Sequence, residues 1–256
     1  MKIHPTAIIS KKARIGADVK VGPYAIIKDG VSIGSGSEIG AFCLIEGDTT
    51  IGKRCRIFTG AVLGSIPQDL KYKGEKSSLK IGDDNIIREY VTMNPGTVAS
   101  YETVIGDRNL FMAYSHVAHD CVVGNDCIIA NNGTLAGHVV VEDKAILGGL
   151  SAAHQFVRIG TLAIVGGCSK VVQDVPPFAT CDGHPAKVYG LNTLGLERHR
   201  IAEESRLALK KAFKLLFFSK LTTATALKRI EKEIEPCPEL ARLIEFVKSS
   251  KRGLAR

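Results

Sequence analysis

Branched aliphatic residues stand at every sixth position over most of this chain. A helix repeats every 3.6 residues and a flat strand every 2, so neither produces a six-residue period, whereas a strand that turns a corner every six residues does. The pattern therefore predicts a parallel β-solenoid whose stacked coils bury one continuous aliphatic column. The series runs in phase from Ile3, Ile9, Ile15 and Val21 to Ile159, Val165 and Val171.

Small residues form a second series, two positions before the aliphatic one. Alternate residues of a strand face the same side, so both series are expected to face one interior. The cysteines of the small series are therefore expected to be packing residues in a reducing compartment, and their spacing fits neither a disulfide framework nor a zinc site. The small series includes Ala7, Ala25, Ser37, Cys43, Cys55, Cys121, Cys127 and Ala163.

The repeat resembles that of the hexapeptide-repeat acyltransferases, in which three hexapeptides make one triangular coil. The spacing alone predicts a parallel solenoid, and the resemblance implies a left-handed parallel β-helix. Two polar stretches interrupt the series, near residues 65–78 and 94–103, and are expected to be excursion loops that leave the solenoid. Long loops on a rigid scaffold are commonly functional or disordered.

The six-residue series ends after Val171, and Pro176 and Pro177 are expected to close the solenoid. From about Leu191 the apolar residues follow a helical period. We therefore expect a β-helix over residues 1–190 and a small C-terminal α-helical domain over residues 191–256. Helices are expected around residues 207–218, 222–234 and 240–247.

Most of the positive charge lies in the expected helical domain. Residues 191–256 hold 15 Lys and Arg against 8 Asp and Glu, so they carry +7 of the chain's net charge of +8. Such a surface can attract nucleic acid, phosphate groups or an acidic protein, but no nucleic-acid motif accompanies it. The repeat starts directly after Met1, and no apolar run approaches a membrane span. We expect a cytosolic protein without a signal peptide or stable membrane insertion.

Four histidines lie outside the inward series: His116, His119, His138 and His154. The last three occupy residues 11, 12 and 10 of their 18-residue coils, so they are expected to stack near one edge of the solenoid. Such a row suits two chemistries. An imidazole can accept the proton of a hydroxyl that attacks an acyl carbon, or three imidazoles can bind zinc. Carbonic anhydrases that share this solenoid place two ligands five residues apart, whereas His116 and His119 are three apart, which favours the first chemistry.

Several segments make the family resemblance more specific. They are Gln68–Tyr72, His116–Cys121, Leu135–His138, His154–Phe156, Gly166–Ser169, Gln173–Pro177, Gly190–Asn192 and Arg252–Leu254. With them the chain is similar, over essentially its whole length, to the UDP-N-acetylglucosamine acyltransferases of lipid A biosynthesis. The resemblance implies transfer of an (R)-3-hydroxyacyl group from the phosphopantetheine thioester of acyl carrier protein to the glucosamine 3-hydroxyl of UDP-N-acetylglucosamine. It also implies no cofactor, a homotrimer with active sites between subunits, and docking of the acidic carrier protein beside the basic helices.

The resemblance assigns catalytic roles to three residues. His119 is the implied general base, because a sugar hydroxyl is a poor nucleophile until its proton has an acceptor. Asp120 is implied to orient or tune this imidazole, although neighbouring residues of a strand point to opposite sides. The N–H of Gly137 is the implied oxyanion donor, while a bend in the chain would also explain a glycine there.

The resemblance also implies a set of substrate-binding residues. Gly167 lies where the family measures acyl length, and a glycine leaves the groove open for a long chain. The rest of the set comprises Gln68, Asp69, Lys71 and Asn94 in the loops, His116 and His138 in the cleft, His154 and Gln155 near the acyl or pantetheine path, and Asn192 and Arg198 at the nucleotide.

Two positions depart from the family pattern, and both lie on the acceptor side. Asn94 stands where the family often has a histidine, and Leu194 stands where a glutamate is common. A 3-amino analogue of the UDP-sugar is therefore an alternative acceptor. An N-acylating sibling fits less well, because it carries an extra domain before its repeats. A zinc-binding or purely structural trimer is the alternative from another class.

Overall fold

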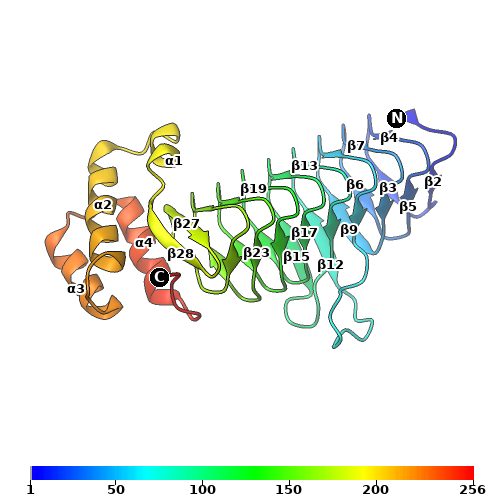
Figure 1. The fold of residues 1–256 in the computed structure, drawn as a ribbon. Helices are drawn as coiled ribbons and strands as arrows, with labels where there is room; N and C mark the ends of the chain where they lie inside the picture. The colour runs from blue at the N-terminus through cyan, green and yellow to red at the C-terminus, as the bar shows by residue number, and fades with distance from the viewer. Residues whose placement is uncertain (1) are drawn as a thin grey trace.

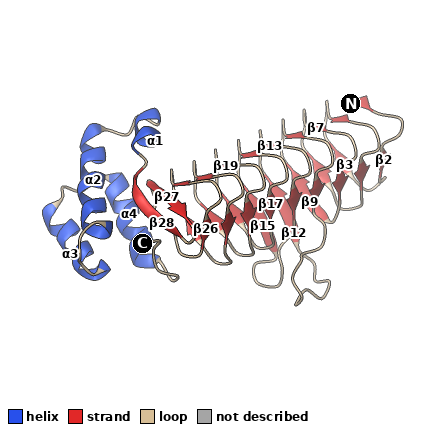
Figure 2. Ribbon diagram, in the orientation of Figure 1, coloured by secondary structure: helices blue, strands red, loops and turns tan. Residues whose placement is uncertain are grey.

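The computed structural model describes residues 2–256 as a triangular prism of stacked coils followed by a group of helices (Figures 1 and 2). Short strands form three sheets, one on each face of the prism. Strands three apart in the sequence pair in parallel, so each coil contributes one strand to each face. The expected left-handed parallel β-helix is confirmed.

The strands divide regularly among the three faces. Face 1 contains β1 (Lys2–Ile3), β4 (Lys20–Val21), β7 (Glu38–Ile39), β10 (Arg56–Ile57), β13 (Ile86–Ile87), β16 (Leu110–Phe111), β19 (Ile128–Ile129), β22 (Ile146–Leu147), β25 (Ile164–Val165), β27 (Ala179–Gly183) and β28 (Ala186–Leu191). Face 2 contains β2 (Ile8–Ile9), β5 (Ile26–Ile27), β8 (Leu44–Ile45), β11 (Val62–Leu63), β14 (Thr92–Met93), β17 (His116–Val117), β20 (Thr134–Leu135), β23 (Ala152–Ala153) and β26 (Lys170–Val171). Face 3 contains β3 (Arg14–Ile15), β6 (Ser32–Ile33), β9 (Asp48–Ile51), β12 (Ser78–Ile81), β15 (Glu102–Ile105), β18 (Val122–Val123), β21 (Val140–Val141) and β24 (Arg158–Ile159).

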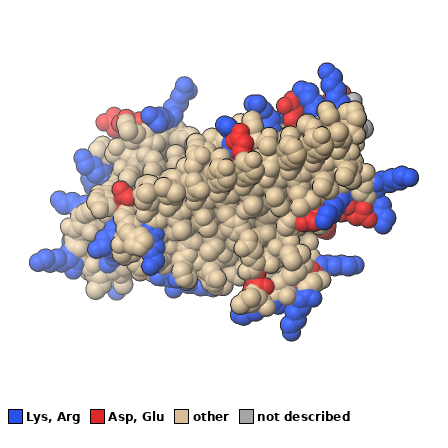
Figure 3. Space-filling model, turned by 45° about the vertical axis from the view of Figure 1, so that its right-hand side comes forward, with Lys and Arg blue, Asp and Glu red and all other residues tan. Residues whose placement is uncertain are grey.

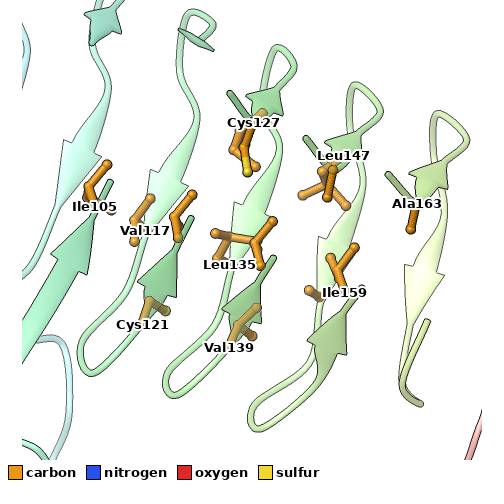
Figure 4. Packing of buried hydrophobic residues seen from close by; sticks show 14 of the residues in the cluster. Ile105, Val117, Cys121, Cys127, Leu135, Val139, Leu147, Ile159 and Ala163 are labelled. Atoms are coloured by element: carbon orange, nitrogen blue, oxygen red, sulfur yellow. The ribbon is translucent and has the colours of Figure 1, made fainter. Parts of the chain in front are cut away.

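The two inward series meet inside the prism as the sequence predicted. Figure 4 shows Val117, Leu135 and other aliphatic side chains stacked from coil to coil, with Cys121 and Cys127 among them. These four residues have no exposed surface, and both cysteines are free thiols. Ile3 is 45% exposed because it belongs to the first coil, which has a neighbour on one side only. Burial therefore comes from stacking and not from a single coil.

The corners of the prism use left-handed backbone at residues other than glycine. Asp120 has φ 58°, His138 has φ 64° and Phe156 has φ 63°, and these three residues occupy the same corner of successive coils. This conformation is unfavourable for a side chain with a Cβ. Hydrogen bonds between corners offset part of that cost: the N–H of His138 donates to the His119 carbonyl at 3.0 Å, and the N–H of Phe156 donates to the Gly137 carbonyl at 3.2 Å.

Both excursion loops leave the prism at the corner between faces 2 and 3. The first connects β11 to β12 and the second connects β14 to β15, at the two polar stretches near 65–78 and 94–103. Figure 1 shows them next to each other on one side of the prism. The corner that carries His119, Asp120 and His138 joins the same two faces one and two coils further on.

The solenoid continues past the two prolines, which corrects the prediction that Pro176 and Pro177 close it. The next strand, β27, pairs in parallel with β25, and Cys181 pairs with Val165. Cys181 lies 16 residues after Val165, whereas partners in the regular coils lie 18 apart. The six-residue series therefore ends here, although a strand still stacks on the coil below. β27 then pairs with β28 in an antiparallel hairpin, which ends the sheet.

Four helices follow: α1 (Thr193–Arg198), α2 (Glu203–Phe217), α3 (Thr223–Glu233) and α4 (Pro238–Ser249). The last three match the predicted helices to within a few residues, whereas α1 is too short to show a period. α2 and α4 bury Leu209, Phe213, Leu243 and Phe246 against each other and the end of the prism. Among residues 2–256, no helix is long and apolar enough to cross a membrane. The domain boundary at residue 190 stays a prediction.

Candidate active site

The site is centred on a hydrogen bond between two consecutive side chains. His119 Nδ1 lies 2.7 Å from Asp120 Oδ2. Consecutive strand residues would point apart, but the left-handed φ of Asp120 turns its side chain back toward His119. His119 is 8% exposed and Asp120 is 6% exposed, so water competes little for this hydrogen bond.

The carboxyl group of Asp120 is held in its ionised form. Burial by itself would raise the pKa of Asp120, but hydrogen bonds from Ser100, Thr97 and His119 outweigh that effect and hold its pKa well below the usual range. An ionised carboxylate only accepts hydrogen bonds. Nδ1 of His119 must therefore carry a proton, so in the neutral imidazole Nε2 is the nitrogen that can accept one.

A glycine is required at position 137 because a side chain would collide with His119, and not because the backbone bends there. Its φ lies outside the left-handed region, but a Cβ at this position would lie 2.5 Å from His119 Cε1 and 2.7 Å from His119 Nε2. The imidazole therefore lies against the bare backbone of Gly137. The N–H of Gly137 has no acceptor among residues 2–256. The same is true of the N–H groups of His119 and Gln155, which occupy the same corner position in the neighbouring coils. Nε2 of His119 therefore lies next to a backbone N–H that has no acceptor within residues 2–256.

Two other imidazoles complete the polar wall of the site. His138 packs edge-on against His119, with ring centroids 5.1 Å apart, and its other side stacks on Phe156 at 4.3 Å. His116 bonds Thr92 Oγ1 through Nδ1 at 2.7 Å. Burial, together with the neighbouring His119, lowers the pKa of His116. Burial also lowers the pKa of His138, against the opposing charge of Asp120. Both imidazoles are therefore neutral hydrogen-bonding groups at neutral pH.

His154 does not join the histidine stack, which corrects the expected row of three. It directly follows β23 and is exposed, and within residues 2–256 its ring bonds only the carbonyl of Gln155, at 3.3 Å. Phe156, two residues later, occupies the corner position above His138. The repeat length correctly predicts which coil a residue belongs to. Within its coil, however, His154 comes two positions earlier than His138 does, and this places it at the strand instead of at the corner. Gln155 is exposed at the corner, one coil beyond Gly137.

The first excursion loop presents polar side chains next to this corner. Gln68 and Lys71 are exposed, and Asp69 Oδ1 accepts the N–H of Lys71 at 3.0 Å in a local turn. Asn94 supports the base of the loop: its Nδ2 donates to the carbonyls of Ser65 at 2.9 Å and Ile66 at 3.2 Å. The buried Asn94 Oδ1 has no partner in the part of the chain that the structure describes.

Three predicted residues lie at other corners of the prism. Asn192 and Arg198 line a groove of about 330 Å³ with Lys144 and His199, at the corner between faces 3 and 1. Gly167 is exposed at the corner between faces 1 and 2. A single chain therefore does not bring these residues to His119.

The side chain of Asn192 has a structural function in the chain itself. Its Oδ1 accepts the N–H of Gly195 at 2.9 Å and so caps α1, and its Nδ2 donates to the Leu162 carbonyl at 2.8 Å. Both ends of the amide are therefore used within the chain.

A metal ion fits this site less well than the hydrogen-bonded pair does. Ligand atoms of His119, Asp120 and His138 lie within 4.8 Å of one another. Both carboxylate oxygens of Asp120 already accept hydrogen bonds from the second loop, and one of them also bonds His119. The zinc alternative requires three imidazoles, whereas the group found within residues 2–256 contains two, His119 and His138.

Sequence reasoning missed Thr97, Ser100, Thr92 and Phe156. Thr97 and Ser100 contact Asp120 only because the second loop folds over it, and Thr92 bonds His116. The corner position of Phe156 could have been found by counting 18 residues from His138, because every coil between them has the regular length. No comparable signal marks Thr97 and Ser100.

Known proteins resemble the chain over its whole length. Residues 174–255 match the family model described as UDP-N-acetylglucosamine O-acyltransferase, domain 2, and residues 12–47 and 102–137 match the bacterial transferase hexapeptide model. A Thermodesulfovibrio yellowstonii protein named acyl-(acyl-carrier-protein)–UDP-N-acetylglucosamine O-acyltransferase is 52% identical over 256 residues, covering 100% of this chain and 99% of the relative. A Thiobacillus denitrificans protein of the same name is 48% identical over 255 residues, covering 99% of each chain.

Solved structures agree with these relatives. LpxA from Acinetobacter baumannii superimposes with a TM-score of 0.96 at 42% identity, covering 99% of both chains. The Arabidopsis UDP-N-acetylglucosamine acyltransferase superimposes with a TM-score of 0.87 at 35% identity, covering 99% of this chain and 100% of that chain.

Proposed function

The chain belongs to the UDP-N-acetylglucosamine O-acyltransferase family, and from this membership we propose how its own residues perform the reaction. The protein is an acyltransferase that moves an acyl group from acyl carrier protein to UDP-N-acetylglucosamine, the first step of lipid A biosynthesis. The acyl group is an (R)-3-hydroxyacyl chain, and the acceptor is the glucosamine 3-hydroxyl. The observation that carries the residue assignment is the oriented His119–Asp120 pair beside the free N–H of Gly137.

His119 acts as general base and then as general acid. Its Nε2 takes the proton of the 3-hydroxyl while the hydroxyl oxygen attacks the thioester carbon, and the ionised Asp120 stabilises the resulting imidazolium. The carbonyl oxygen becomes an oxyanion, which the N–H of Gly137 stabilises. The intermediate then expels the pantetheine sulfur, which receives the proton from Nε2. The reaction is balanced without a cofactor.

The acceptor sugar binds between the first loop and the histidine wall. Gln68, Asp69 and Lys71 supply hydrogen bonds from the loop, and His116 and His138 supply them from the prism. Neutral imidazoles suit this role, because each offers a donor and an acceptor. Asn94 contributes mainly by supporting the loop. A 3-amino acceptor would use the same wall, because an amine also delivers its proton to His119.

The complete site is assembled between neighbouring subunits of a homotrimer. Asn192 and Arg198, which bind the nucleotide, and Gly167, which leaves the groove open for a long acyl chain, lie at corners other than that of His119. A threefold arrangement of prisms sets one corner of a subunit against a different corner of its neighbour. The groove at Asn192 also contains Lys144, Arg198 and His199, and such basic groups suit a diphosphate.

Acyl carrier protein docks on the helical domain, with its thioester arm reaching past His154 and Gln155. Figure 3 shows Lys and Arg side chains projecting from the helical end of the molecule. Lys210, Lys211 and Lys214 of α2 are among the positive charges that give this domain its net +7. An acidic partner gains both affinity and association rate from such a surface.

The decisive experiment is an acyl-transfer assay with the purified protein. UDP-N-acetylglucosamine and its 3-amino analogue are each offered with acyl carrier protein that bears (R)-3-hydroxyacyl chains of several lengths. We expect transfer to the 3-hydroxyl sugar with a preference for long chains. No transfer to either sugar, with stoichiometric zinc in the protein, would support the zinc-binding alternative instead.

A further inference from the structure

The second excursion loop wraps over the carboxylate of Asp120. Four donors from two loop residues reach its oxygens: the Thr97 N–H at 2.9 Å, the Thr97 hydroxyl at 2.7 Å, the Ser100 N–H at 3.2 Å and the Ser100 hydroxyl at 2.5 Å. The Ser100 hydroxyl also lies 2.8 Å from the Glu102 carbonyl. Its single proton goes to the closer, charged acceptor, because such hydrogen bonds are the stronger ones.

The two loop residues divide the two oxygens between them. Oδ1 of Asp120 accepts both donors of Ser100 and the N–H of Thr97, whereas Oδ2 accepts only the Thr97 hydroxyl and His119 Nδ1. The oxygen that orients the imidazole is therefore fixed from its other side by one hydroxyl. We propose that Thr97 and Ser100 are positioning residues for the catalytic base: they clamp Asp120 so that it holds the ring and the tautomer of His119.

A clamp is needed because the backbone alone does not fix the contact. His119 and Asp120 are adjacent at a corner, and rotation about χ1 of Asp120 would swing Oδ2 away from Nδ1 without any change in the fold. Reaction geometry is sensitive to such shifts, since a displacement of about 1 Å can cost about a hundredfold in rate. Donors that hold the carboxylate from the loop remove this freedom.

The clamp itself is fastened to the first loop. Glu75 accepts the N–H of Val98 at 3.2 Å and the N–H of Lys73 at 2.9 Å, so its carboxylate bridges the two loops. Within the second loop, Thr97 Oγ1 accepts the N–H of Ala99 at 3.3 Å, which leaves its own proton for Asp120. Glu75 of the first loop is thus linked to His119 through Val98, the peptide bond between Val98 and Thr97, and Asp120.

The same donors also set the protonation of the pair. Burial alone would raise the pKa of Asp120, and the bonds from Ser100 and Thr97 reverse this. Removing them makes the carboxylate more basic, so the His119–Asp120 pair takes up its proton at a higher pH. The acid limb of the pH profile of kcat/KM must then move to higher pH, which simple loss of folded protein does not produce.

The test uses the full-length enzyme in the acyl-transfer assay, with Thr97→Val, Ser100→Ala and the double variant. The matched control is Thr103→Val, because Thr103 is equally buried and its hydroxyl has no partner within residues 2–256. Thr97→Ser restores the hydroxyl and is the rescue variant. Thermal unfolding checks that each variant is folded. If Thr97→Val does not fold, Ser100→Ala alone tests the clamp, because Ser100 is exposed and its substitution leaves the core unchanged.

We expect kcat of the double variant to fall about 10- to 100-fold, with KM for the UDP-sugar changed less than about twofold and the acid limb moved to higher pH. Thr97→Ser and Thr103→Val should behave as wild type. The proposal would be overturned if the double variant kept the wild-type kcat and the wild-type acid limb of the pH profile. It would also be overturned if kcat fell while the acid limb stayed at its wild-type pH. The inference rests on the proposed role of His119, and an inactive wild-type enzyme would refute that function instead.

Discussion

His119 and Asp120 are neighbours in the sequence and partners in the structure, with Nδ1 2.7 Å from Oδ2. The left-handed φ of 58° at Asp120 makes this possible, because it reverses the alternation of side chains that a strand would impose. A corner of the prism therefore pairs a base with its carboxylate within two residues.

Removing the imidazole should abolish acyl transfer. We expect His119→Ala to lower kcat by at least about a hundredfold, because general-base catalysis contributes about 10²- to 10⁴-fold. His154→Ala is the matched control, since His154 is exposed and lies outside the stack; its effect should be confined to KM for the acyl carrier protein. Near-normal turnover of His119→Ala would exclude His119 as the base.

Asp120 should make stability depend on pH. A carboxyl group whose pKa is lowered in the folded state contributes stability that is complete above its ordinary pKa of 3.8 and is lost as the pH falls through the folded value. Each unit of lowering corresponds to about 1.4 kcal/mol. Asp120→Asn should therefore unfold at a lower temperature than wild type at pH 6, and the gap should narrow toward pH 3. A gap independent of pH would contradict the assignment.

Gly137→Ala should separate activity from folding. The added Cβ meets the side-chain ring of His119 and not backbone, so the ring can move aside. We expect a folded protein with a slightly lower thermal midpoint, because the displaced ring loses its bond to Asp120, and a loss of kcat of about a hundredfold, because the base is displaced. Gly190→Ala is the control, because a Cβ there has nothing within 4 Å. Equal activity of the two variants would show that Gly137 needs no special shape.

Gly167→Met should shorten the preferred acyl chain. Gly167 is exposed, and a Cβ would lie 3.3 Å from the Gly149 carbonyl oxygen, so a side chain is accommodated after a small adjustment. The methionine would then fill the groove that a long chain occupies. Assays with carrier protein bearing different chain lengths should show the preference moving to shorter chains, with Gly167→Ala in between. An unchanged profile would remove Gly167 from this role.

Asn192→Ala should destabilise the fold as well as weaken nucleotide binding. The variant loses the cap of α1 and leaves the Leu162 carbonyl without its donor, which together cost about 1–3 kcal/mol. Denaturant unfolding measures this change directly. Thr193→Ala is the control, because Thr193 is an exposed neighbour in α1. An unchanged unfolding midpoint in Asn192→Ala would assign the side chain to the ligand alone.

The sequence by itself determined the scaffold. A six-residue period is a local property repeated many times, so it predicted a parallel solenoid, its two inward series and the two stretches that leave it. A helical period after Leu191 predicted the helices, and the family resemblance supplied the triangular, left-handed coil. The same period kept the histidines off the interior, and the motif at His119 indicated the chemistry. The last coil escaped this reasoning because β27 stacks 16 residues after β25 and so falls out of phase.

Only the tertiary structure decided how the site works. The meeting of His119 with Asp120, the space that Gly137 leaves for the ring, and the clamp from Thr97 and Ser100 depend on corner dihedral angles and on a loop that folds back over a later coil. The separation of Asn192, Arg198 and Gly167 from His119 likewise follows from which corner each occupies. A period counts positions along the chain, whereas contacts at a corner depend on the direction in which each side chain leaves it.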